Sequence, residues 1–184
     1  MNKFFLIVPS LILLSSCASV YKLNDAILNQ GTRYTEPTTG KTANVRVFYG
    51  LGKNIRIYPN SSTKAEIKND MDKGDAFTSV KTSGMFGAAK FEYAPKTLGM
   101  PNTPKYNLDY GEFKVPAGRP ILLSMSYSYN NGARSTFCNT QLFRTEFEEN
   151  KNYALAINVN SGCYYLIKEY IGDEEVSMKN IEKL

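Results

Sequence analysis

The stretch NYALAINVNSGCYYLIKEYI (residues 152–171) decides the fold class. Apolar residues alternate with small or polar ones in its first half, and one face carries Tyr153, Leu155, Ile157 and Val159. A period of two is typical of a β-strand with one buried face. The sequence NSG then predicts a turn, and residues 163–171 predict the strand that follows it.

The same signals recur earlier in the chain. Strands are predicted at residues 44–50, 54–60, 120–129 and 134–147, each ended by turn residues. The first two are separated by a short glycine-containing turn and are predicted to form a β-hairpin. Several short strands with little helix indicate an all-β fold, an antiparallel β-sandwich or a partly open barrel.

The cysteines favour the sandwich. After Cys17 the chain has two cysteines, Cys138 and Cys163, which lie on the first and third strands of a meander predicted over residues 134–171. In an exported protein they favour a disulfide, with a metal pair or a reactive thiol as alternatives, although a metal needs more ligands. In a flat meander such strands lie roughly 10 Å apart, whereas a disulfide needs Cα atoms within about 7 Å. A disulfide therefore implies two packed sheets or a changed strand order.

The stretch from residue 83 to 113 combines four glycines and three prolines with apolar side chains. Glycine and proline at this density oppose long regular elements, yet the stretch is too apolar for a disordered linker. It is either a long connection that packs across a sheet edge or an exposed loop that contacts a partner. We predict partner contact for Met85 and Phe86, and packing against the domain for Leu98 and Met100.

The predicted domain spans residues 44–172. Residues 17–43 have poor periodicity and predict a tether. Residues 173–184 predict a C-terminal tail or a short docked helix, because apolar residues recur there at three-residue spacing.

The chain begins MNKFFLIVPSLILLSSCASV. Lys3 and the apolar run that follows it predict a secretory signal, which is too short to span a bilayer. The alternatives are a plain signal peptide in which Cys17 is incidental and a buried N-terminal helix. The sequence Leu14-Ser15-Ser16-Cys17 then resembles the lipobox of bacterial lipoproteins, an aliphatic residue and two small residues before a cysteine. The resemblance covers the first tenth of the chain. It implies that residues 1–16 are a lipoprotein signal peptide and that Cys17 is the first mature residue.

The lipobox resemblance implies a lipid anchor. Cys17 would carry a diacylglycerol on its sulfur and usually a third acyl chain on its amino group. Each buried methylene contributes about 0.8 kcal/mol, so two or three chains hold almost irreversibly. In enteric-type bacteria an Asp after the cysteine favours the inner membrane, and Ala18 stands there instead. The family rule therefore implies the outer membrane, with the protein facing the periplasm.

A second, looser resemblance concerns the domain. From VPAGRPI (115–121) to the end of the predicted meander, the chain resembles Ig-like modules of small bacterial envelope lipoproteins. In those modules an AG-x-P turn opens a strand, and a K-x-Y turn and a late cysteine recur. This resemblance implies only the sandwich.

Composition excludes several function classes. The net charge is +5, of which the signal peptide contributes Lys3, and the basic residues are scattered with no nucleic-acid motif. No nucleic-acid partner is therefore expected. The chain has no histidine, which excludes Ser-His-Asp triads, Cys-His dyads and HExxH zinc sites. We expect no cofactor and no metal.

These observations predict a non-catalytic envelope protein that binds or assembles with a protein partner through an edge strand or residues 83–105. The alternative is a hydrolase that acts on cell-envelope glycan through two carboxylates. The candidate carboxylates are Glu92, Asp109, Glu112 and Glu146, which no motif joins.

Overall fold

The computed structural model describes residues 33–50, 52–77, 79–83, 89–93, 96–104, 109–130, 135–160 and 162–184. They belong to one compact unit, Thr32–Leu184. These segments contain twelve strands, one 3-10 turn (η1, Ile67–Asn69) and no α-helix. None of them forms an apolar helix of bilayer-spanning length.

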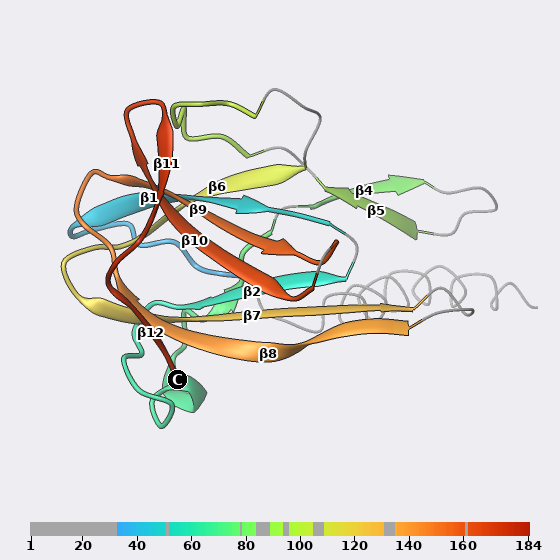
Figure 1. The fold of residues 1–184 in the computed structure, drawn as a ribbon, viewed down its shortest axis with the longest axis horizontal. Helices are drawn as coiled ribbons and strands as arrows, with labels where there is room; N and C mark the ends of the chain where they lie inside the picture. The colour runs from blue at the N-terminus through green and yellow to red at the C-terminus, as the bar shows by residue number, and fades with distance from the viewer. Residues whose placement is uncertain are drawn as a thin grey trace, which may run out of the picture. The chain divides into compact units, whose positions relative to one another are not determined.

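Ten strands form two five-stranded sheets (Figure 1). Sheet 1 has the order β11-β10-β9-β1-β6, with bounds Glu174–Ser177, Tyr164–Ile171, Asn152–Asn158, Thr42–Phe48 and Tyr110–Pro116. Sheet 2 has the order β12-β8-β7-β2-β3, with bounds Ile181–Lys183, Ser135–Glu146, Pro120–Asn130, Lys53–Tyr58 and Gly74–Asp75. The other two strands, β4 (Ser79–Ser83) and β5 (Ala89–Tyr93), form a separate hairpin.

The predicted all-β sandwich is confirmed. Neighbouring strands are antiparallel except for β1 and β9, which pair in parallel from Asn44↔Asn152 to Val47↔Leu155. A parallel pair needs a long connection, and here the connection includes four of the five strands of sheet 2, namely β2, β3, β7 and β8. Sheet 1 is therefore completed by segments from the two ends of the domain.

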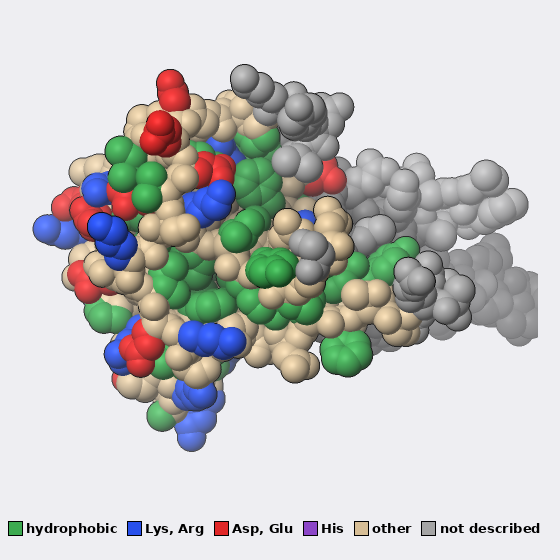
Figure 2. Space-filling view, viewed as in Figure 1, with side chains coloured by type: hydrophobic (Ala, Val, Ile, Leu, Met, Phe, Trp, Pro, Cys, Tyr) green, Lys and Arg blue, Asp and Glu red, His purple; other side chains and the backbone are tan. Residues whose placement is uncertain are grey.

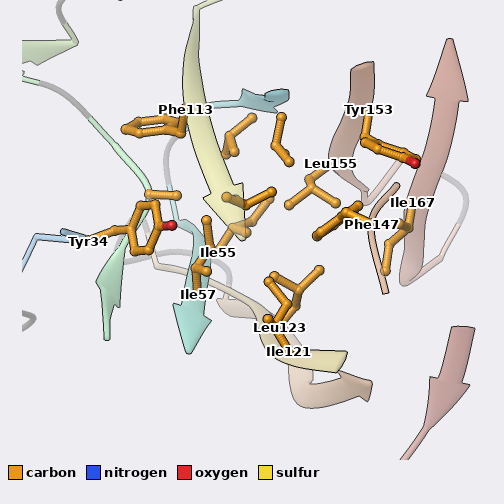
Figure 3. Close-up of a cluster of buried hydrophobic side chains, with 14 of the residues drawn as sticks. Tyr34, Ile55, Ile57, Phe113, Ile121, Leu123, Phe147, Tyr153, Leu155 and Ile167 are labelled. Atoms are coloured by element: carbon orange, nitrogen blue, oxygen red, sulfur yellow. The ribbon is translucent and has the colours of Figure 1, made fainter. Parts of the chain in front are cut away.

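The core lies between the two sheets, as the alternation in β9 predicts. Tyr153, Leu155 and Ile157 are at most 1% exposed. Figure 3 shows Tyr153 and Leu155 in one cluster with side chains from sheet 2, such as Ile57 and Leu123. This burial of apolar surface is the main stabilising contribution to the fold.

The predicted hairpin between residues 44–50 and 54–60 is wrong. β1 pairs with β6 and β9 in sheet 1, whereas β2 pairs with β3 and β7 in sheet 2. Both strands still bury the predicted face in the same core, so alternation alone cannot distinguish a hairpin from a crossing between sheets. Gly52 permits the crossing, because it has φ 77° and a Cβ there would lie 2.2 Å from the main-chain oxygen of Ser128.

The ends of the domain also differ from the prediction. Residues 173–184 form the edge strands β11 and β12 rather than a tail or a helix. Met178, which lies between these strands, and Ile181, the first residue of β12, pack against the core. In the predicted tether, Tyr34 is 7% exposed and its hydroxyl donates to the carbonyl of Lys114 at 2.9 Å. The packed domain therefore includes residue 34, ten residues before the predicted start.

Candidate partner-contact site

Cys138 and Cys163 form a disulfide between the two sheets, which confirms the predicted pair. β8 carries Cys138 and the start of β10 follows Cys163, and their Cα atoms are 5.6 Å apart. A β-bulge in β8 turns Cys138 toward sheet 1. Met125 pairs with Gln141 but Tyr127 pairs with Cys138, so β8 contains one extra residue. Without it, alternation would turn Cys138 away from sheet 1.

The candidate carboxylates of the alternative hydrolase are not brought together. Asp109 is exposed just before β6, and Glu146 is exposed at the end of β8 opposite Pro120. Because β6 runs from Tyr110 to Pro116 and leads directly into β7, these two residues lie about 20 Å apart at opposite ends of the sandwich. The side chain of Glu92, in β5, is outside the described part of the structure.

The fourth candidate, Glu112, forms a buried ion pair with Arg46. The two residues are directly opposite each other on β6 and β1. Their neighbours Val45, Val47 and Phe113 point into the core, so Arg46 and Glu112 project from the outer face of sheet 1. Both are nevertheless at most 1% exposed. Arg46 Nη2 donates to Glu112 Oε1 at 2.7 Å and Nε donates to the same oxygen at 3.0 Å.

The ion pair is covered by residues 96–104, which we call the strap. Arg46 donates to three strap carbonyls, those of Met100 (3.2 Å), Pro101 (3.0 Å) and Asn102 (2.7 Å). Glu112 Oε2 accepts the main-chain N–H groups of Leu98 and Met100. The strap is therefore held through its backbone, by both partners of the ion pair.

Around the pair is a second, smaller apolar cluster. Met100 of the strap is 5% exposed and packs with Phe48, Ala154 and Tyr170 on the outer face of sheet 1. The predicted packing of Met100 is thus confirmed. Leu98 is 37% exposed, so the prediction for its side chain is wrong. Leu98 contributes its main-chain N–H instead.

The electrostatics keep Glu112 ionised. Burial raises the pKa of Glu112, but the hydrogen bonds from Arg46 and from the N–H groups of Leu98 and Met100 outweigh burial and lower the pKa below its ordinary value. The Arg46 guanidinium also lies over two tyrosine rings, 5.1 Å from the centroid of Tyr110 and 5.3 Å from that of Tyr170. A carboxylate held in this way accepts hydrogen bonds and is poorly suited to donate a proton.

The outer edge of β6 is blocked. Lys114 donates its N–H to Glu36 Oε2 at 2.8 Å and accepts the Tyr34 hydroxyl, while Glu112 donates its N–H to the carbonyl of Lys96 at 2.8 Å. Main-chain groups that could pair with another strand are thus occupied. At the β8 edge of sheet 2, β12 covers Phe143 to Thr145.

The β4–β5 hairpin differs from these edges. Its strands pair with each other from Ser79↔Tyr93 to Ser83↔Ala89, and with no other described strand. Both of its outer edges are therefore unpaired within the described chain. Of the predicted site residues, Cys17, Met85 and Phe86 lie outside the described residues; the last two are in the connection between β4 and β5.

Charge and metal chemistry single out no other site. In the view of Figure 2, basic and acidic side chains are interspersed, without a large patch of one sign. Among the described residues, no group of three or more His, Cys, Asp or Glu side chains could hold a metal ion.

Sequence reasoning missed the Arg46–Glu112 pair. Arg46 stands between two valines in an alternating strand, a position that usually faces water. The only signal was in the strap, where Met100 lies between a glycine and a proline and needs an apolar contact. With this geometry described, the comparison with known proteins is negative: the chain matches no family model, no curated protein and no solved structure.

Proposed function

We propose that the protein is a lipid-anchored, non-catalytic component of the bacterial cell envelope, held at the periplasmic face of the outer membrane. Its β4–β5 hairpin contacts an envelope protein partner. The connection of that hairpin carries Met85 and Phe86, whose apolar side chains suit the centre of a contact.

The observation that carries the proposal is the isolation of the hairpin. A two-stranded hairpin alone is marginally stable in water, and its open edges are templates for another strand. The same chain blocks the edge of β6 with Glu36, Tyr34 and Lys96. Because the outer edges of the β4–β5 hairpin are unpaired within the described chain and the edge of β6 is occupied, the hairpin is where a partner can add a strand.

Two further features support an envelope location. The lipobox-like sequence ends at Cys17, sixteen residues before the first described residue, Arg33. The disulfide suits an oxidising compartment such as the periplasm. Glycan hydrolysis has less support, because Glu112 is committed to Arg46 and the exposed candidates Asp109 and Glu146 are far apart.

Two experiments test the proposal. Cells are fed a clickable palmitate analogue, and Cys17→Ala should abolish labelling and leave the precursor unprocessed; undiminished labelling would refute the anchor. A photo-crosslinking amino acid is then placed at Phe86, with Met71, which is 89% exposed, as the matched control position. We expect a discrete crosslinked protein from position 86 and none from position 71. Equal crosslinking at both positions would refute the contact.

A further inference from the structure

We infer that the Arg46–Glu112 pair is a latch for the β4–β5 hairpin, although neither residue belongs to the hairpin. The latch keeps the hairpin conformationally ordered and fixes the direction in which its chain returns to sheet 1. The inference deepens the proposed function and rests on it where it concerns partner binding. The latch itself is a property of the isolated protein and is tested separately.

The described residues on either side of the hairpin attach it to the sandwich, one attachment before β4 and one after β5. Before β4, Ala76 donates its N–H to the carbonyl of Ile55 at 2.9 Å, and the side chain of Phe77 packs against the core. After β5, the carbonyl of Lys96 accepts the N–H of Glu112. The first attachment is at β2 and β3 of sheet 2, and the second is at β6 of sheet 1. The hairpin thus leaves one sheet and returns to the other.

The latch directly follows the second attachment along the chain. Lys96 itself is held by the main-chain N–H of Glu112 and by its own ion pair with Glu36. Leu98, whose N–H donates to Glu112, is the fifth residue after Tyr93 at the end of β5, so the chain between them spans at most about 17 Å. The contacts run from the two charged side chains to consecutive main-chain groups of the strap. They therefore hold the main chain of the strap, in addition to the packing of the Met100 side chain and the hydrogen bond that Asn102 Nδ2 donates to the carbonyl of Gly172 at 3.0 Å.

The latch is separable from the core. Met100 and its neighbours form a cluster on the outer face of sheet 1, whereas the main core lies on the inner face. Opening the strap would expose its carbonyl and N–H groups to water, which can satisfy them. Replacing both buried charges by apolar residues of similar volume often leaves a protein folded. Such a replacement removes the hydrogen bonds to the strap and keeps the two sheets.

The test compares amide hydrogen exchange in the wild-type chain and in the double variant Arg46→Met with Glu112→Leu. The matched control, Lys168→Met with Glu175→Leu, removes an exposed ion pair between β10 and β11 of the same sheet. In the latch variant we expect at least about tenfold faster exchange in residues 79–83, 89–93 and 98–102, with sheets 1 and 2 unchanged. The control variant should exchange like the wild type.

Two outcomes would overturn the latch. In one, exchange rises in the strap but not in the hairpin, so that the pair holds only the strap. In the other, the hairpin already exchanges at the rate of an unfolded peptide in the wild type, so that there is no order to set. If the double variant does not fold, Arg46→Lys decides instead. It keeps a charge opposite Glu112 but lacks the planar fork that reaches three carbonyls, and it should raise hairpin exchange in the same way.

Crosslinking from Phe86 then links the latch to the partner. Loss of the crosslinked product in the folded latch variant, with its retention in the control variant, supports the inference. Equal crosslinking in all three proteins would overturn the role of the latch in binding. Absence of any product from the wild type would refute the proposed contact, while the exchange data would still decide the latch.

Discussion

Two of the links between distant segments of the described domain differ in their chemistry. Between β8 and β10 a disulfide joins the two sheets covalently. On the outer face of sheet 1 an ion pair with its hydrogen bonds holds the strap. A disulfide acts largely by restricting the unfolded chain. A buried ion pair stabilises only while each partner is satisfied, since the cost of burying a lone charge is large. The stabilisation by the disulfide therefore depends little on the neighbouring side chains, whereas the stabilisation by the ion pair depends on both charges keeping their hydrogen-bond partners.

The largest effect should come from breaking half of the ion pair. Arg46→Ala leaves Glu112 buried without its main partner, and we expect a loss of about 4 kcal/mol in the free energy of unfolding. Urea denaturation measures this loss. The double variant Arg46→Met with Glu112→Leu should retain most of the wild-type stability. If the double variant lost as much as Arg46→Ala, the pair itself would be contributing the stability rather than the avoidance of a lone charge.

Breaking the covalent tie should cost somewhat less. Cys138→Ala with Cys163→Ser opens a loop of 25 residues, and we expect a loss of about 3 kcal/mol. Reduction of the wild type should lower the stability by a similar amount in the same denaturation assay. Non-reducing mass spectrometry of the wild-type protein should find the two cysteines joined. Ready alkylation of both thiols without reductant would contradict the bond.

A smaller loss of stability should come from a change in the apolar packing of the strap that leaves the Arg46–Glu112 pair intact. Met100→Ala removes the side chain that fills the cluster with Ala154 and Tyr170, and we expect a loss of about 2 kcal/mol. Leu98→Ala, in the same strap but 37% exposed, should change the melting temperature very little. Equal melting temperatures for the two variants would show that the cluster adds nothing to the ion pair.

The smallest effect concerns a single hydroxyl. Tyr34→Phe removes its hydrogen bond to Lys114 and should cost about 1 kcal/mol at neutral pH. Burial, and then the nearby carboxylates of Glu36, Asp72 and Asp70, raise the pKa of Tyr34 far above its ordinary value. A raised pKa favours the neutral phenol in the folded state, so this contribution is complete below about pH 10 and declines above it. Denaturation between neutral and alkaline pH should therefore show a flatter decline for Tyr34→Phe than for the wild type.

The two ties also differ in how far the sequence predicts them. If the chain is exported, as its lipobox-like sequence predicts, the two remaining cysteines predict a bond, and their strand spacing then predicts two sheets. Arg46 and Glu112 give no such signal, because each is a charged residue in an alternating strand and 66 residues separate them. Only the pairing of β1 with β6 brings them together, and nothing in the local pattern specifies that pairing.

The same limit explains the wrong hairpin. Val45 and Val47 predict the buried face of β1 correctly, yet the choice of neighbour depends on β6 and β9, which come much later in the chain. Strand identity is local, whereas strand order is a property of the whole sandwich. The predicted site residues Met85 and Phe86 lie outside the described residues, so their role stays a prediction.

The position of β1 has a consequence for the order of folding. This strand is the first strand of the described domain, but its neighbour β9 pairs with it across 108 residues, at Asn44 and Asn152. Contacts of such high sequence separation form slowly, whereas the hairpins β7–β8 and β9–β10 close locally. We therefore expect β1 to stay unpaired, with its valines exposed to solvent, until β6 and β9 have formed.

Val47→Ala should then accelerate unfolding and leave the refolding rate nearly unchanged, which stopped-flow kinetics can measure. A slowed refolding rate would instead place β1 in the nucleus. A late β1 would make the interval before β9 pairs with it the time when this protein is most exposed to aggregation.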